Sequence, residues 1–271
     1  MAKAPARTVA LLDADPELGR LLSEDRLRTA RRHLTARTHQ VPTGPWDAER
    51  LRGTGPEHVG LLILEGVVAR EVVLADSVSC ELLGEGDVVR PWQSADPVEL
   101  LRSRVRWTVL DGVSLAILDR RFAGLLGQFP EVNAMLVDRL SVQTQRLAAL
   151  KAIAQLNGVD RRLLSLFWHL AERWGRVVPE GIAVTMPVPH RLLAQLVGAR
   201  RPTVSTALRQ LAERRELIRT SGDTWVLLGE PVGLPEGEAA RVIRCRRLRF
   251  RRDHVEAPGN GSRFSELREV L

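Results

Sequence analysis

The sequence has 271 residues, of which 44% are hydrophobic, so the chain can bury a sizeable core and favours two domains over one. Its net charge is +7, and nearly all of the positive charge is arginine because Lys3 and Lys151 are the only lysines. No apolar leader or membrane-length apolar run occurs, so we expect no membrane partner and no export. Cys80 and Cys245 stand far apart, which argues against a disulfide framework or a metal site and favours a reducing cytoplasm.

The first half of the chain predicts a helical segment followed by consecutive strands. Residues Thr8–Thr35 place leucines at helical spacing, with Asp15-Pro16-Glu17 as a start signal. Short β-branched runs separated by Gly or Asp turns such as Glu65-Gly66 come next, at His58–Leu64, Val67–Leu74, Ser77–Leu83, Val105–Asp111 and Val113–Asp119. Such a series predicts an antiparallel roll or sandwich.

The period then changes to that of a long helix, Pro130 to about Asn157. Six positions alternate spacings of four and three, as in a coiled-coil seam, and all but the polar Gln143 are apolar: Leu136, Leu140, Gln143, Leu147, Leu150 and Ala154. We interpret this seam as a homodimer contact in which Gln143 sets the register. The alternative is that the helix packs only against its own domain. A second helix is predicted over Asp160–Trp174, ending at Gly175.

The segment His190–Arg209 predicts two short helices joined by a tight turn. Ala194 allows a close helix crossing, Gly198 permits the turn, and Val204 belongs to the shared apolar face. Leu217–Gly229 follows as a hairpin, which we interpret as a wing. Seven arginines accompany these elements against only Glu213 and Glu216, so the pattern indicates binding of double-stranded DNA.

The last forty residues differ in composition from the rest. VGLPEGEAA is typical of a flexible linker, and the run Arg241–Arg252 holds seven arginines and no acidic residue. Two interpretations stay open for this tail: an accessory arm for DNA or RNA phosphates, or a solvated extension.

This order of elements resembles the Crp/Fnr family of bacterial transcription regulators. The resemblance covers roughly Val59 to Gly229 and is most specific from Val188 onward, where VPHRLLAQLVGARRPTVSTALRQLAERRELI is similar to the family's DNA-binding signature. LILEGVV and LLGEGDVV are weaker matches to turns of the family's cyclic-nucleotide-binding-like roll. The resemblance implies an α+β fold with an N-terminal antiparallel β-roll of jelly-roll type, a long dimerisation helix and a C-terminal winged helix-turn-helix.

The chain departs from the family members that bind cyclic AMP. In those members a Gly-Glu pair follows the Gly-x-Gly-Asp turn, whereas here Arg90, Pro91 and Trp92 stand in that region, although Arg102-Ser103 matches a later Arg-Ser pair. The family's adenine-contacting hydroxyl pair would fall near Leu147 and Ala148. The sequence therefore argues against cyclic AMP. It also argues against an iron-sulfur cluster, because no cysteine precedes Cys80, and it leaves heme open through His33, His39 and His58.

On the DNA side, the resemblance transfers residue by residue. Arg201 matches the family arginine that reads a guanine edge, while Pro202 and Thr206 replace a glutamate and a second arginine, so a different half-site is implied. The full set of predicted DNA contacts is His190, Arg191, Arg200, Arg201, Thr203, Ser205, Thr206 and Arg209.

We therefore expect a cytoplasmic homodimeric regulator, not an enzyme, that binds a near-palindromic operator and has a degenerate sensor domain. RNA polymerase is a further candidate partner. The expected domains are 1–128 (roll with helical start), 129–158 (dimerisation helix), 159–230 (winged helix-turn-helix) and 231–271 (basic tail). Two alternatives stand beside this expectation: a receiver-like N-terminus with Asp13 and Asp15 as its acidic pair, and an enzyme built on the roll.

Overall fold

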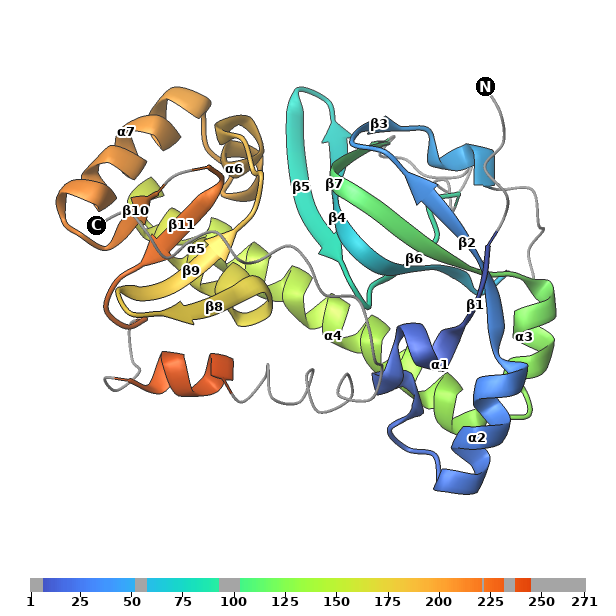
Figure 1. Ribbon diagram of the computed structural model, residues 1–271. Helices are drawn as coiled ribbons and strands as arrows, with labels where there is room; N and C mark the ends of the chain where they lie inside the picture. The colour runs from blue at the N-terminus through green and yellow to red at the C-terminus, as the bar shows by residue number, and fades with distance from the viewer. Residues whose placement is uncertain (1–6, 52–57, 93–102, 221, 232–236, 245–271) are drawn as a thin grey trace.

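The computed structural model describes residues 7–51, 58–92, 103–220, 222–231 and 237–244. Within these ranges the chain forms two lobes that a single long helix joins (Figure 1). The N-terminal lobe is an antiparallel roll and the C-terminal lobe combines helices with a small sheet, which confirms the α+β fold expected from the sequence. Cys245 and most of the arginine-rich tail lie outside the described residues.

The roll is a seven-stranded antiparallel sheet with the main order β1-β2-β7-β4-β5. Strand β3 pairs with β7, and β6 pairs with β4. The strands are β1 (Thr8–Ala10), β2 (Thr35–Val41), β3 (Gly44–Trp46), β4 (Gly60–Leu74), β5 (Ser77–Gly84), β6 (Val88–Val89) and β7 (Arg104–Leu118). This arrangement contradicts the receiver-like alternative, which requires a parallel sheet.

Two pairs of strands predicted as hairpins are instead single strands of 15 residues each, β4 and β7. The predicted turn at Glu65-Gly66 is an irregularity within the β4–β7 ladder, where the register shifts between Ile63 and Val68. Gly66 has a φ of +89°, and a Cβ there would lie 2.3 Å from the carbonyl oxygen of Gly112 on β7. The two glycines therefore bend paired strands and do not end them.

The predicted N-terminal helix is broken into several elements. Thr8–Ala10 pairs with β2 as an edge strand, and α1 (Leu11–Ala14), the 3₁₀ helix η1 (Pro16–Gly19) and α2 (Glu24–His33) follow. A second 3₁₀ helix, η2 (Ala48–Leu51), follows β3. The predicted start signal holds, because Pro16 opens η1. Leucines of α1 and η1 are buried against α3 (Arg120–Leu126) and the first turns of the long helix.

The long helix α4 spans Pro130–Ala154 and runs from one lobe to the other (Figure 1). Its predicted seam is only partly buried by the chain itself. Leu136 and Gln143 are buried within the chain, whereas Leu140 and Leu147 are exposed. The assignment of Gln143 as a register-setting contact between two chains is therefore wrong, because the Gln143 side chain is buried within its own chain.

The C-terminal lobe begins with α5 (Val159–Trp174), which ends before Gly175 as the sequence predicts. A four-stranded antiparallel sheet of order β10-β11-β9-β8 packs beside three helices. Its remaining elements are β8 (Gly175–Val178), β9 (Gly181–Thr185), α6 (His190–Leu196), α7 (Arg201–Glu213), β10 (Leu217–Arg219) and β11 (Thr224–Leu227). The predicted wing hairpin is β10–β11, and the unpredicted strands β8 and β9 extend it into a sheet.

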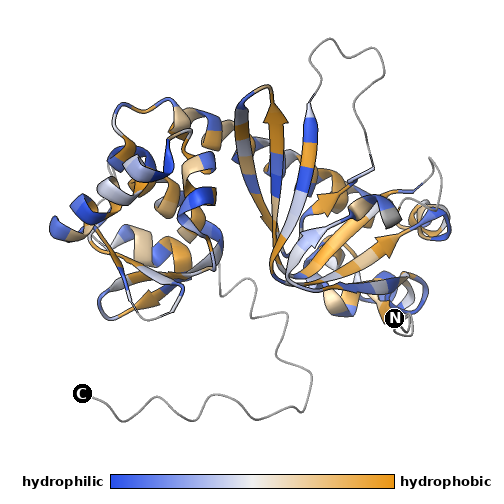
Figure 2. Cartoon of the chain, turned by 90° about the horizontal axis from the view of Figure 1, so that it is seen from above, coloured by the Kyte–Doolittle hydropathy of each residue, from blue (hydrophilic) through white to orange (hydrophobic). Residues whose placement is uncertain are grey.

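One apolar cluster crosses from lobe to lobe. Ala69, Cys80 and Leu82 of the β4–β5 hairpin share it with the buried residues of α5, α6 and α7. Colouring by hydropathy shows apolar residues along the strands and helices of both lobes (Figure 2). A short helix at residues 238–244 joins the same cluster through Ala239 and Ile243. The roll is thus packed directly against the helices of the C-terminal lobe.

Candidate nucleic-acid interface

Helices α6 and α7 form the predicted helix-turn-helix pair. The turn between them is possible because Gly198 has a φ of +61°, a conformation that glycine adopts without strain. Ala194 and Val204 are both buried where the two helices meet. Pro202 occupies the first turn of α7, where its missing N–H has no intrahelical acceptor. The sequence prediction of this motif is confirmed in each of these details.

Arg162 of α5 holds this turn through hydrogen bonds to backbone carbonyl oxygens, which the sequence did not indicate. Its Nη1 donates to the carbonyl oxygens of Val197 and Gly198 at 3.2 and 3.4 Å, and its Nε donates to that of Leu156 at 2.7 Å. The guanidinium thereby satisfies carbonyl groups that end α6 and start the turn. Arg162 is a positioning residue for the helix pair.

The outward face of α7 carries the predicted contacts. Arg200 and Arg201 are exposed, and in the described part of the chain neither takes part in an ion pair. Thr203, Ser205, Thr206 and Arg209 are exposed on the same helix. Thr206 and Ser205 each donate a hydroxyl hydrogen bond to a carbonyl oxygen one turn earlier, at 3.3 Å. A helix with its apolar side buried and these donors outward has the character required to enter a major groove.

His190 links the two helices. Its Nδ1 lies 3.1 Å from Ser205 Oγ, and its ring lies 6.4 Å from that of Trp225 on β11. Burial lowers the pKa of His190, and the positive charges of Arg219 and Arg201 lower it further. The imidazole thus joins α6, α7 and the wing.

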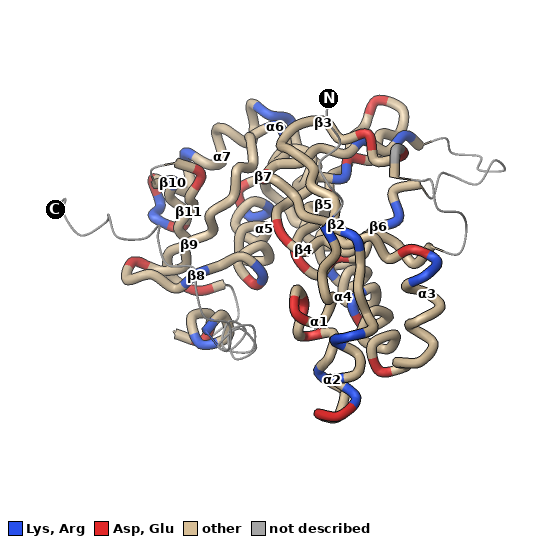
Figure 3. Tube along the Cα trace, turned by 45° about the vertical axis from the view of Figure 1, so that its right-hand side comes forward, with Lys and Arg blue, Asp and Glu red and all other residues tan. Residues whose placement is uncertain are grey.

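Two arginines at the wing and at the end of α7 are both paired with acidic side chains. Arg219 stacks over Trp225, with its guanidinium 5.3 Å from the ring centroid, and pairs with Asp223 at 3.1 Å. Arg214, which the sequence placed in the positive surface, pairs with both Asp160 and Glu216 at 2.9 Å. Figure 3 shows basic segments near α6 and β10, with acidic segments interspersed. Arg209 of α7 also pairs with Glu213, at 3.6 Å, so Arg200 and Arg201 carry the positive charge of the helix pair that no ion pair within the described residues neutralises.

Arg191 of α6 forms an ion pair with the roll. Its Nη1 lies 2.6 Å from Oε1 of Glu71 on β4, and the side chain of Glu71 is 3% exposed. Arg106 of β7 lies 3.5 Å from the same carboxylate oxygen. A predicted DNA contact of α6 is thus held by the roll, a pairing between residues 120 positions apart that no local pattern indicates.

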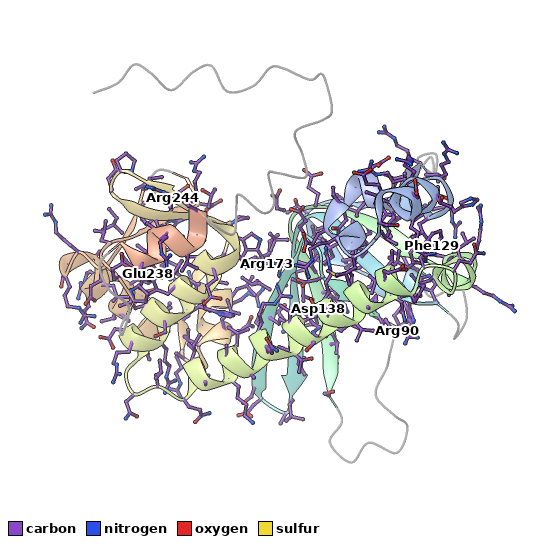
Figure 4. All side chains as sticks on the ribbon, turned by 90° about the horizontal axis from the view of Figure 1, so that it is seen from below. Arg90, Phe129, Asp138, Arg173, Glu238 and Arg244 are labelled. Carbon is purple, nitrogen blue, oxygen red and sulfur yellow. The ribbon has the colours of Figure 1, made fainter. Side chains whose placement is uncertain are left out.

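A second ionic contact joins the lobes at the turn Gly84–Asp87. The Asp87 carboxylate is 2% exposed, accepts a hydrogen bond from the Gly84 amide at 2.9 Å, and pairs with Arg146 of α4 and with Arg173 of α5. The Arg173–Asp87 distance is 2.7 Å, and Arg173 lies between the lobes (Figure 4). The predicted turn is confirmed, and it anchors the C-terminal lobe on the roll.

The residues considered for cofactors do not come together. His33 and His39 are exposed on α2 and β2. His58 is buried with its ring 4.7 Å from that of Trp92. Burial, with Glu71 beside it, raises the pKa of the Cys80 thiol to about 12. Among the described residues, no group of three or more His, Cys, Asp or Glu side chains is placed to hold a metal ion, and no helix is long and apolar enough to cross a membrane.

Comparison with known proteins agrees with this geometry. Residues 161–231 match the model of the Crp-like helix-turn-helix domain. The C-terminal lobe is a Crp-like helix-turn-helix domain. No curated protein matches the sequence.

Most of the chain is similar in fold to solved structures of 18–20% identity. A cyclic nucleotide-binding domain containing protein from Listeria monocytogenes superposes with a TM-score of 0.56, covering 79% of this chain and 97% of that one, at 18% identity. A CooA mutant from Carboxydothermus hydrogenoformans gives 0.55 at 18% identity, covering 71% and 83%. A regulator of the CRP family from Thermus thermophilus gives 0.50 at 20% identity, covering 76% and 96%.

The family model thus covers the C-terminal lobe, and the solved structures share the fold of the roll, the long helix and that lobe. The matched model is that of a DNA-binding domain, which favours the DNA-binding regulator over the enzymatic alternative.

Proposed function

We propose that the protein regulates transcription as a homodimer that binds a near-palindromic operator through α7. The observation that carries this proposal is the exposed polar face of α7, with Arg201 in its first turn and unpaired within the described residues. A guanidinium so placed suits the O6 and N7 acceptors of guanine, and its neighbours Thr203 and Thr206 suit other base edges or phosphates. Arg200, Ser205 and Arg209 complete the proposed contact face of α7, with His190 and Arg191 contributing from α6.

The proposed dimer contact is the outward side of α4. Val137, Leu140 and Leu147 are 58%, 47% and 37% exposed, and they recur at spacings of three and seven residues along one face. Thr144 lies between them, and its hydroxyl is already bonded to the Leu140 carbonyl oxygen at 2.9 Å. A stripe of this kind on a 25-residue helix fits a two-helix seam with a second copy of the chain. Two α7 helices would then be presented about 34 Å apart, in successive major grooves.

We infer that the roll does not bind cyclic AMP. After Asp87 the chain runs through Val89 and Trp92 into the roll interior, where Trp92 is 9% exposed and belongs to the apolar core. Arg90 and Pro91 precede it in the region where a Gly-Glu pair would be required. The roll then acts either through another small ligand in its interior or as a structural platform for the dimer.

We divide the chain functionally as the sequence suggested: the roll through residue 128, the dimerisation helix 129–158, the DNA-binding domain 159–230 and the basic tail 231–271. Cytoplasmic localisation and contact with RNA polymerase belong to the same proposal.

Selection of binding sites from a random duplex library tests the function. We expect enrichment of a near-palindrome whose half-site centres are one helical turn apart, about 34 Å. Enrichment of single, asymmetric sites only would refute the dimeric operator. Titration of cyclic AMP followed by tryptophan fluorescence and calorimetry tests the sensor, and saturable binding would refute that part.

A further inference from the structure

We propose that Glu71 of the roll and DNA phosphate compete for Arg191, so that docking of α6 on the β4–β5 hairpin weakens DNA binding. The inference rests on the proposed function, because it assumes that Arg191 contacts the DNA backbone. It assigns to the roll a direct effect on the DNA-binding helices that requires no ligand.

The first observation is the pairing itself. Arg191 Nη1 lies 2.6 Å from Glu71 Oε1, a short charge-assisted hydrogen bond. The carboxylate side is buried, with 3% exposure of Glu71, whereas the Arg191 side chain is 52% exposed. Arg106 is a more distant second partner of the carboxylate, at 3.5 Å. The contact thus joins a fixed anion on the roll to a cation at the surface of α6.

The second observation is that α6 as a whole is seated on the roll. Ala69, Cys80 and Leu82 of the hairpin belong to the same apolar cluster as Leu192 and Leu196 of α6. Figure 1 shows α6 on the side of its lobe that faces β5. Helix α7, in contrast, keeps its polar face exposed. Docking therefore engages one helix of the pair and leaves the other open, which predicts weakened binding and not complete inhibition.

The two anions exclude each other for an electrostatic reason. A phosphate that approached Arg191 in the docked state would face the Glu71 carboxylate across one guanidinium, and like charges at such distances repel. If Arg191 instead turned to the phosphate, Glu71 would lose its nearer partner while still buried, which is costly. Glu71 and Arg191 both line an open hollow of about 820 Å³ beside β3 and β7, so the ion pair can be reached from solvent on that side.

Salt-dependent DNA binding by the full chain tests the competition. The probe is a fluorescent mixed-sequence duplex, titrated over a range of KCl concentrations. We compare Glu71→Gln with Glu17→Gln, which also removes one negative charge from the roll lobe but breaks only a partly exposed ion pair with Arg20. Glu71→Gln should bind about three- to tenfold more tightly at low salt, with a log–log salt slope steeper by about 0.9, the value for one additional phosphate contact. Glu17→Gln should stay within about twofold of the wild type.

Arg191 must carry the gain. In an Arg191→Ala background, Glu71→Gln should add nothing to affinity or to the salt slope. A persistent gain would overturn the competition, because it would show that Glu71 acts on DNA binding through another group.

Cys80 provides a second readout that needs no DNA. It is 6% exposed and lies beneath the docked α6, so loosening of the contact should expose its thiol. With Cys245→Ser in every variant, the rate of modification by a thiol reagent should rise several-fold in Glu71→Gln. Arg191→Gln removes the other partner of the ion pair and should raise the thiol modification rate in the same way. If Glu71→Gln proves unstable in thermal unfolding, the rate measured for Arg191→Gln replaces it as the test.

The outcomes separate the two proposals. Equal DNA affinity and equal thiol modification rates for Glu71→Gln and Glu17→Gln would overturn the inference. Weaker DNA binding by Glu71→Gln would also overturn it, because Glu71 would then orient Arg191 toward the DNA. Absence of DNA binding by the wild type would refute the proposed function instead. The thiol rate would then decide the docked contact alone: an increase supports it and an unchanged rate overturns it.

Discussion

Asp87 should be the residue of the interlobe contact most sensitive to substitution. Its carboxylate is 2% exposed and has three partners: the Gly84 amide, Arg146 and Arg173. Removing one partner of a buried ionic pair costs about 3 to 5 kcal/mol. The two arginines remain 26% and 18% exposed, so solvent screens part of the lost interaction. We therefore expect Asp87→Ala to lower the free energy of unfolding by about 3 kcal/mol, the lower end of that range.

Urea denaturation followed by tryptophan fluorescence and circular dichroism measures this loss. Asp138→Ala is the matched control, because Asp138 is an exposed aspartate on α4 (Figure 4) and such changes stay within about 0.5 kcal/mol. Asp87→Asn should fall between the two, since the amide oxygen can still accept from Gly84 while the charge is lost. If Asp87→Ala and Asp138→Ala unfold at the same urea concentration, the contact does not stabilise the chain and the reasoning fails.

Three further predictions concern DNA reading, assembly and pH. Arg201→Ala should cost about 1 to 3 kcal/mol and relax one base position in a binding-site selection, whereas a uniform loss across sequences would make Arg201 a phosphate contact. Leu140→Asp with Leu147→Asp should yield monomers in sedimentation equilibrium without lowering the helix content, and an unchanged mass would exclude the α4 seam. Burial lowers the pKa of His58, so the folded state disfavours its charged form. The stability that depends on neutral His58 should be fully present above the unfolded-state pKa of about 6.5 and be lost as the pH falls through the lower folded-state pKa. His58→Phe should flatten that dependence in urea titrations between pH 7 and 5, and a slope equal to that of the wild type would contradict this assignment.

Local patterns are sufficient to predict the helix pair, because each of its requirements is local. Gly198 at the turn, Pro202 in the first turn of α7 and Val204 at the crossing follow from spacing and backbone chemistry alone. The long helix is predictable for the same reason. Its two faces cannot be distinguished in this way, because Leu136 and Leu140 look alike in sequence, and only the position of the roll determines which one is buried.

Features that depend on distant partners cannot be predicted from local patterns. The sequence predicts a turn at Gly66 because a glycine between two β-branched runs usually ends a strand, whereas here it faces Gly112 at an irregularity within the β4–β7 ladder. The motif assigns Arg191 to DNA without its partner, since nothing near either residue indicates that Glu71 lies 2.6 Å away. The hydrogen bonds of Arg162 cannot be predicted either, because their acceptors are backbone carbonyl groups, which every residue has.

The apolar cluster shared by the two lobes restricts how this protein can change over evolution. Leu82 on the roll and Leu196 on α6 belong to one packed group, so a volume change at either position is felt by both lobes. A chimera that joins this roll to the helix pair of a distant relative would have to match the shape of that group as well as the charges at its edge. Sequence drift in the roll and in the DNA-reading lobe is therefore expected to be correlated, even if the roll has no ligand to recognise.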